Sequence, residues 1–236
     1  MKSGALVITM GHICFSEPPT LDGILGGMAF NEHRDGPRAA LVPEVDRKDG
    51  VPMASRAILV GQKSTTSHTR IRSFGKHIRA DPSISTAASE KGWRKDIENT
   101  DHGKPALTRN LVHDVTNVVF LARCEPSIVL ERFAAHPRIG TSRKDFGLID
   151  KVDWIDLPDH DLFGIVGNGA LLRPVPSSMA SGLGNNLETK TQFGFWQSPY
   201  HPEVAQRVGI SATPVTYPVQ HFSVGDLEEA LEFACR

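Results

Sequence analysis

The chain has 236 residues, of which 39% are hydrophobic and 22% charged. This is ordinary globular usage, which excludes wholesale disorder, and no apolar run reaches the ~18 residues of a membrane-spanning helix. The net charge of -1 excludes a uniformly basic protein, yet residues 56–109 hold eleven Lys and Arg against five Asp and Glu. We expect a single cytoplasmic domain over residues 1–236, with a local basic surface suited to a polyanion.

The N-terminal segment predicts a strand, Ala5–Phe15, rather than a signal peptide, because polar residues break its apolar run and no small-residue cleavage site follows. Two prolines end this strand, and Thr20 is placed to cap a helix that begins at Leu21. The apolar spacing from Leu21 to Met28 predicts one buried stripe on that helix.

A second strand is expected at Arg56–Gly61, followed by a long basic insertion over residues 63–110. The segment Val112–Cys124 has the strongest strand pattern of the chain. Glu125 and Pro126 end it, and Pro126 opens the next helix.

The apolar face expected on this second helix consists of Ile128, Leu130, Phe133 and Ala134. A further strand is expected within residues 147–157, and the remainder predicts strands near 189–196 and 213–219. The chain then ends in a helix with a core-facing stripe. Two strand-helix-strand halves with antiparallel additions favour an α+β, ferredoxin-like fold.

Basic residues and an aromatic ring alternate in the insertion. In an extended chain Arg70 and Arg72 share one face, where they line up two cations along a phosphate backbone. Trp93 between cations suits base stacking, whereas the alternative is a charged loop whose tryptophan packs into the core. The candidate RNA contacts of the insertion are Arg70, Arg72, Lys76, His77, Arg79, Trp93, Arg94 and Lys95.

A Gly-rich basic loop, residues 136–147, separates the second helix from the following strand. Glycines let backbone N–H groups approach a phosphate closely, and the flanking cations neutralise its charge. A solvated turn with surface charges is the alternative. The loop lacks the pattern of a nucleotide-binding P-loop. Its candidate RNA contacts are Arg138, Gly140, Arg143 and Lys144.

Catalytic and metal motifs are missing from the sequence. The ten histidines and three cysteines form no zinc-binding or redox pattern, so we expect no cofactor and buried reduced thiols. His12 or His77 could act as the base in metal-free RNA cleavage, whereas a hydrogen-bonded structural role is the commoner one for a strand histidine.

The strand followed by PPTLDGILGGMAF, the basic central segment and IGTSRKDFGLIDKV together resemble the RAMP superfamily of CRISPR-associated proteins. Within it the chain is most similar to the type IV effector-complex subunits that bind the 5′ handle of the CRISPR RNA. The resemblance covers residues 4–30 and 136–155, and the rest matches only in general order.

The resemblance implies a ferredoxin-like, RNA-recognition-motif-like core that holds guide RNA without cutting it. It implies contacts to the handle from a thumb-like projection, here residues 63–110, and from the Gly-rich loop through Gly140, Arg143, Lys144 and Gly147. The implied partners are guide RNA, the backbone and large subunits of the complex and target DNA near the PAM, with no membrane. A metal-free RAMP endoribonuclease that processes repeat RNA is the alternative.

Overall fold

The computed structural model describes residues 1–15, 17–33, 42–72, 106–139, 147–183, 188–198, 205, 209–219 and 222–234, with backbone alone at 30–33, 68–72 and 106–110. The strands are β1 (Lys2–Thr9), β2 (His12–Phe15), β3 (Arg47–Lys48), β4 (Val51–Pro52), β5 (Ile58–Val60), β6 (Ser64–Arg72), β7 (Ala106–Asp114), β8 (Asn117–Cys124), β9 (Lys151–Asp156), β10 (Val166–Gly167), β11 (Ala170–Leu171), β12 (Val175–Pro176), β13 (Thr189–Gly194), β14 (Thr213–Pro218) and β15 (Ser223–Val224). The helices are α1 (Leu21–His33), α4 (Pro126–Ala135), α5 (Ser177–Ala180) and α7 (Leu227–Glu232).

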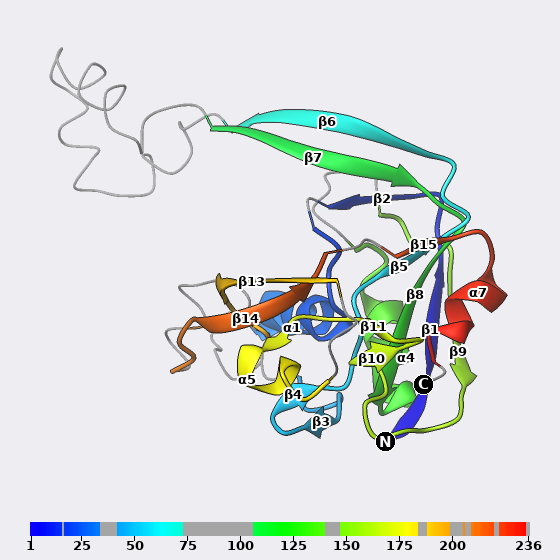
Figure 1. Ribbon diagram of the computed structural model, residues 1–236. Coiled ribbons are helices and arrows are strands. Elements are labelled where there is room, and N and C mark those ends of the chain that lie inside the picture. The colour runs from blue at the N-terminus through cyan, green and yellow to red at the C-terminus, as the bar shows by residue number, and fades with distance from the viewer. Residues whose placement is uncertain are drawn as a thin grey trace, which may run out of the picture. The chain divides into compact units, whose positions relative to one another are not determined.

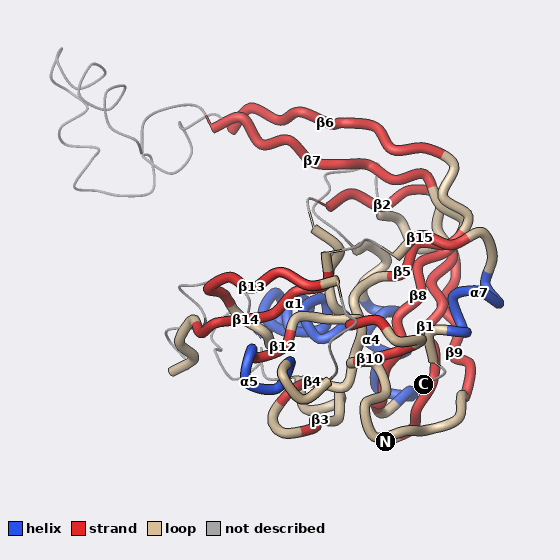
Figure 2. Tube along the Cα trace, in the orientation of Figure 1, coloured by secondary structure: helices blue, strands red, loops and turns tan. Residues whose placement is uncertain are grey.

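The chain divides into two compact units, one formed by residues 1–65 with 112–236 and the other by residues 66–111. The first unit contains the five-stranded sheet, in the order β15-β5-β8-β1-β9 (Figure 1). In the second unit β6 and β7 run side by side as hydrogen-bonded neighbours. Strand predominates over helix in the described part of the chain (Figure 2), and the expected α+β class is confirmed.

The central strands of the sheet pair antiparallel. β1 pairs with β8 from Lys2↔Cys124 to Thr9↔Asn117 and, on its other edge, with β9. β8 pairs antiparallel with β5, and only β15 lies parallel to its neighbour. Along the chain these elements follow one another as β1, α1, β5, β8, α4 and β9, which places the first and third strands at the centre of the sheet.

Side chains cover the sheet on both faces. One face of β1, with Leu6 and Ile8, packs against α1 and α4, while the other, with Ala5 and Val7, packs against residues from the last third of the chain, including α7. A strand buried on both faces has no polar side to alternate with its apolar side. The continuous apolar run of β1 is the result.

Two segments expected as single strands are each bent into two. Ala5–Phe15 divides at Met10 and Gly11 into β1 and β2, and Val112–Cys124 divides at Val115 and Thr116 into the end of β7 and β8. The bends lie opposite one another, since Met10 N–H donates to Thr116 O at 3.3 Å and Val115 N–H donates to Gly11 O at 3.1 Å. The two segments therefore bend together as one ribbon, and the expectation of single strands was wrong.

The helices follow the sequence in part. Thr20 caps α1 as expected, because its hydroxyl oxygen accepts a hydrogen bond from Gly23 N–H at 3.2 Å. On α4 the expected apolar face is confirmed at Phe133, which is buried, and at Leu130, which packs against the core, but it was wrong at Ile128, which is 43% exposed, and at Ala134, which is exposed. Val129 is the second buried residue of the helix. The buried pair spans one helical turn, which is enough to fix a short helix on the sheet.

Candidate nucleic-acid interface

The ends of the Gly-rich loop are joined by backbone hydrogen bonds. Arg138 and Leu148 form an antiparallel bridge, and Ile139 N–H donates to Gly147 O at 2.9 Å. Ile149 N–H donates to Pro137 O at 2.9 Å. We call residues 137–139 and 147–149 the loop clasp. The clasp therefore places Ile139 and Gly147, the residues on either side of 140–146, next to each other, while residues 140–146 themselves lie outside the described residues.

Gly147 is required at its position in the clasp. Its φ of +78° lies in the left-handed region, and a Cβ there would come within 1.9 Å of Ile139 O. A side chain would therefore collide with the backbone of Ile139, in addition to the strain of the conformation. The glycine lets the two backbones of the clasp approach each other.

The clasp is attached to β2. Gly147 N–H donates to His12 O at 2.9 Å, and Ile139 is buried in the core that β2 shares with α1. On the same strand the Phe15 ring stacks on His113, with ring centroids 4.6 Å apart. The structure thus brings His12 beside the base of the Gly-rich loop. Both His12 and Arg138 are exposed there.

The structure describes only some of the other residues predicted to contact RNA. Arg70 and Arg72 belong to β6, so the expected extended backbone is present, and the structure describes no side chains there. The other candidate contacts lie outside the described residues: Lys76, His77, Arg79, Trp93, Arg94, Lys95, Gly140, Arg143 and Lys144. Of the predicted set, Arg138 is the residue whose side chain and surroundings the structure describes.

A pocket of about 420 Å³ opens where the chain enters α1. It is formed by five separated parts of the first unit, and its lining residues are Glu17, Pro18, Pro19, Thr20, Gly23, Arg56, Pro174, Gly194, Phe195 and Tyr217. The PPT segment by itself predicts only a turn and a helix cap, and no local pattern indicates the pocket, because its walls come from separated parts of the chain.

The polar groups of this pocket interact with one another. Arg56 is buried and donates to Pro18 O at 3.3 Å and to Pro218 O at 3.4 Å. Its Nη2 lies 3.8 Å from Oε2 of Glu17, whose side chain is 64% exposed. Burial raises the pKa of the Tyr217 hydroxyl, and the nearby Glu17 carboxylate raises it further, whereas a hydrogen bond with the Gln192 side chain lowers it. The side chains of Glu17, Arg56 and Tyr217 therefore lie in the same pocket and influence one another electrostatically.

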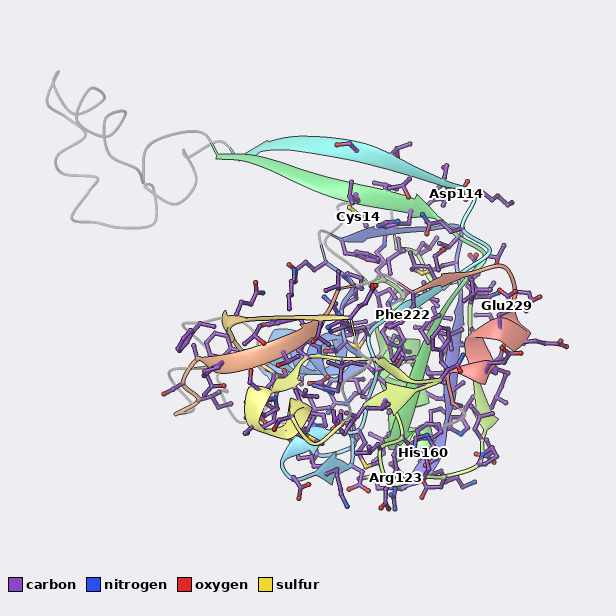
Figure 3. The ribbon with its side chains drawn as sticks, in the orientation of Figure 1. Cys14, Asp114, Arg123, His160, Phe222 and Glu229 are labelled. Atoms are coloured by element: carbon purple, nitrogen blue, oxygen red, sulfur yellow. The ribbon has the colours of Figure 1, made fainter. Side chains whose placement is uncertain are left out.

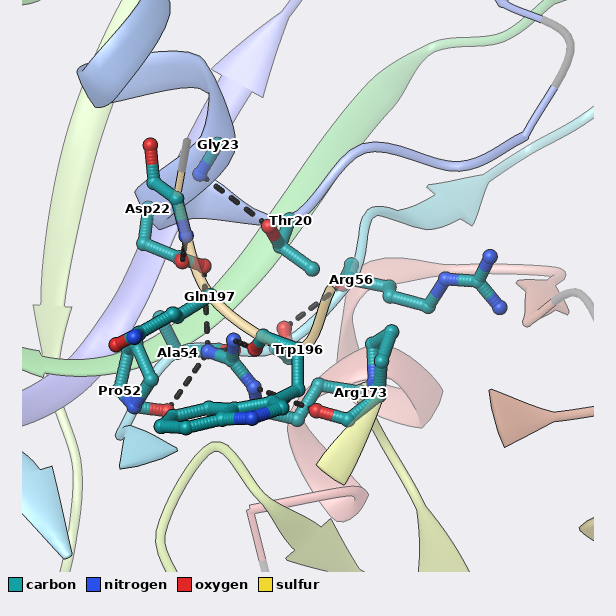
Figure 4. Close-up of polar contacts among 12 residues, drawn as sticks. Thr20, Asp22, Gly23, Pro52, Ala54, Arg56, Arg173, Trp196 and Gln197 are labelled. Atoms are coloured by element: carbon teal, nitrogen blue, oxygen red, sulfur yellow. Dashed lines mark hydrogen bonds and ion pairs between the residues drawn. The ribbon is translucent and has the colours of Figure 1, made fainter. Parts of the chain in front are cut away.

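Beneath the start of α1 lies a buried ion pair that sequence analysis also missed (Figure 4). Arg173 is fully buried, and its Nη1 donates to Asp22 Oδ1 at 3.2 Å, to Pro52 O at 2.7 Å and to Ala54 O at 2.8 Å. Its Nη2 donates to Trp196 O at 2.7 Å. The second oxygen of Asp22 accepts from Ser198 N–H at 3.2 Å. This cluster joins α1 to three distant chain segments and positions the pocket wall.

The cysteines and the acidic segment near His160 have structural roles. The Cys14 and Cys124 side chains are buried, as expected, and Cys235 lies outside the described residues. Arg123 pairs with Asp159 at 3.4 Å, and His160 hydrogen-bonds Ala234 O at 3.1 Å; Figure 3 shows Arg123 and His160 at the same end of the first unit. Among the described residues no cluster of His, Cys, Asp and Glu could hold a metal ion.

Comparison with the models of known protein families finds no match, and comparison with curated proteins finds none either. No helix in the described part of the chain combines the length and apolar character needed to cross a membrane. Inference about function therefore depends on the geometry of this chain.

Proposed function

We propose that the protein is a non-catalytic RNA-binding subunit of a type IV CRISPR ribonucleoprotein, built on a RAMP-type core. The observation that carries the proposal is the order of elements: strand, helix, strand, strand, helix, strand, with β5-β8-β1-β9 as the antiparallel sheet order. In our proposal this order corresponds to the split β-α-β arrangement of ferredoxin-like domains. The covering of the second sheet face by the last third of the chain is an addition to it.

The position of the basic insertion supports this proposal. Residues 63–110 lie between β5 and β8, the two strands that a short hairpin would otherwise connect. This segment carries the strands β6 and β7 and most of the chain's local surplus of Lys and Arg. In our proposal it forms a thumb-like projection, and Arg70 and Arg72 on β6 follow the phosphates of the guide RNA.

The loop clasp supports the second proposed contact. A Gly-rich loop binds phosphate well when its ends are fixed, because less conformational entropy is then lost on binding. The clasp fixes these ends through Gly147, while exposed Arg138 adds a cation at the rim. In our proposal Gly140, Arg143 and Lys144 hold the 5′ handle of the guide RNA.

Protein neighbours complete the proposed assembly. The subunit caps the filament of backbone subunits, meets the large subunit, and lies near target DNA at the PAM. Outside residues 56–109 the chain carries 15 Lys and Arg against 22 Asp and Glu, so this part is net acidic, and in our proposal it docks protein while the basic segment holds RNA.

Guide RNA retention tests the proposal. The complex co-expressed with its guide should yield RNA of one defined length on a gel, and Arg143→Glu should lower the amount retained, because it places a negative charge among the proposed phosphate contacts. Lys48→Glu makes the same charge change on the β3 hairpin and should retain RNA as the wild type does. Equal retention by both variants would exclude the loop as a contact, and absence of RNA from the wild-type complex would exclude the function.

The position of His12 favours one alternative, a metal-free RAMP endoribonuclease. His12 is exposed beside the clasp, where a bound 2′-hydroxyl could lose its proton to the imidazole. Incubation of the purified protein with repeat RNA in EDTA separates the two functions. Discrete products that disappear in His12→Ala or His77→Ala would establish cleavage and refute the non-catalytic proposal.

A further inference from the structure

The pocket at the start of α1 has the composition of a small-ligand site. Its volume of about 420 Å³ lies in the range of ~300–1,000 Å³ that such sites occupy. Three prolines and the rings of Phe195 and Tyr217 contribute flat, apolar walls. Gly194 is needed beside them, because a Cβ there would come within 2.2 Å of the Tyr217 hydroxyl. Walls of this kind suit a planar aromatic ring, which stacks on them.

The polar side chains of the pocket limit which kind of aromatic ring could bind there. The Glu17 carboxylate only accepts hydrogen bonds, and the Arg56 guanidinium only donates them. The two lie side by side, with 3.8 Å between Arg56 Nη2 and Glu17 Oε2. A ring edge that meets both must present donors next to an acceptor. The Watson–Crick edge of guanine does so, with N2–H and N1–H matching the two carboxylate oxygens and O6 beside them facing the cation.

We propose that this pocket holds a guanine base, taken out of the stack of a single-stranded RNA. Adenine and cytosine each present only one donor group on this edge, and uracil presents one N–H between two acceptors, so none of them satisfies both carboxylate oxygens. The inference rests on the proposed RNA-binding function, and it adds a base-specific contact to phosphate contacts that carry no sequence information.

The pocket is built so that its carboxylate can turn toward a ligand. Glu17 is 64% exposed, and its distance of 3.8 Å from Arg56 is longer than a hydrogen bond. Arg56 is held in place by the carbonyls of Pro18 and Pro218, so the cation stays at the pocket while Glu17 reorients. The occupant exchanges one long ion pair for a bidentate contact with Glu17.

Titration of the purified full-length protein with GMP, AMP, CMP and UMP, followed by calorimetry, tests the proposal. We expect GMP to bind at least tenfold more tightly than the other three nucleotides. Guanosine should compete with GMP, and inorganic phosphate should not. Equal affinity for the four nucleotides, no binding of GMP, or displacement of GMP by phosphate alone would overturn the proposal.

Glu17→Gln is the informative variant, because it replaces one acceptor with a donor on a side chain that is 64% exposed. It should weaken GMP binding about tenfold and leave AMP binding unchanged. Glu131→Gln, the same change on the exposed side of α4, should bind GMP as the wild type does. Equal GMP affinity in the wild type and both variants would remove Glu17 from the site and overturn the proposal.

The RNA content of the same preparation separates this inference from the proposed function. RNA that co-purifies with a protein that does not bind GMP would refute the guanine pocket and support the function. GMP binding by Glu17 without any retained RNA would support the pocket and refute the function. Failure of both would refute both.

Discussion

At the scale of single residues, the most consequential side chain is Arg173. It is fully buried and donates to Asp22 and to four backbone carbonyls, those of Pro52, Ala54, Pro174 and Trp196. Nothing in the local sequence, an arginine after two leucines, indicates burial. Its environment is created by elements that meet only in the folded chain, which is why single-sequence reasoning missed both the ion pair and the pocket above it.

Removal of the Arg173 charge should lower the stability of the fold. Arg173→Met leaves the Asp22 carboxylate buried beside orphaned carbonyls, and we expect the free energy of unfolding to fall by about 3–5 kcal/mol. Urea denaturation measures the change. Arg47→Met, which removes an arginine that bonds Gly50 O and Gln197 nearer the surface, should cost about 1 kcal/mol. A loss below about 1 kcal/mol for Arg173→Met would show that the pair contributes little.

Burial also determines the ionisation of Cys124. Burial, together with a smaller effect of the neighbouring Glu125 carboxylate, raises the pKa of this thiol from 9.0 to about 12. The unfolded chain therefore loses its thiol proton near pH 9 while the folded chain keeps it. The protonated Cys124 thiol therefore favours the folded state. This contribution to the free energy of unfolding is complete below pH 9 and is lost as the pH rises toward about 12.

A comparison of the wild type with Cys124→Ala checks this titration. The stability difference between the two should shrink as the pH is raised from about 8 to about 11, because only the wild type carries the thiol. Urea denaturation at each pH provides the measurement. A difference that stays constant over this range would contradict a raised pKa for Cys124.

At the scale of elements, local patterns predicted the structure well wherever their causes were local. The cap at Thr20, the start of α4 at Pro126 and the strand β5 all depend on neighbouring residues, and all are present. The shared bend of the ribbon at Gly11 and Thr116 was missed. It depends on pairing between segments more than 100 residues apart, which no local pattern records.

The requirement for glycine in the clasp can be tested by comparing Gly147 with Gly169, a glycine of similar backbone conformation outside the clasp. Gly147 and Gly169 have φ values of +78° and +70°, but a Cβ meets Ile139 O at 1.9 Å in the first case and nothing within 4 Å in the second. Gly169→Ala should cost about 1–2 kcal/mol, the strain of the conformation alone. Gly147→Ala should cost clearly more, because the clasp must open.

Thermal and urea unfolding of the two variants measure this difference, and RNA retention reports on the loop. We expect Gly147→Ala to retain less guide RNA than Gly169→Ala, which lies in the β10–β11 turn. Equal stability losses in the two variants would show that the backbone at Gly147 yields without breaking the clasp.

At the scale of the whole molecule, the chain separates charge along its length. Residues 66–111 contain nine Lys and Arg and five Asp and Glu, and they form a compact unit of their own. The first unit closes without them, since Lys63 N–H donates to Asp114 O at 2.9 Å and the Thr65 hydroxyl lies 3.2 Å from His113 Nδ1. Strand pattern and local charge indicated this insertion from the sequence, whereas its pairing of β6 with β7 required the structure.

Replacement of residues 66–111 by a short Gly-Ser linker tests this division. We expect the variant, with its net charge lowered from -1 to -5, to keep the circular dichroism of a folded protein and to lose most of its guide RNA. In the wild type, RNA affinity should fall linearly with salt on a logarithmic scale, and the slope should be smaller in the variant. An unchanged slope would place the phosphate contacts elsewhere.

The parallel pairing of β15 with β5 affects synthesis of the chain. Leu59 N–H donates to Phe222 O at 2.9 Å, and Gly61 N–H donates to Val224 O at 2.9 Å. On the ribosome β5 emerges about 160 residues before this partner, so its open edge is exposed to other nascent chains for about 8–30 s. Binding by a chaperone during that interval would protect the edge from aggregation.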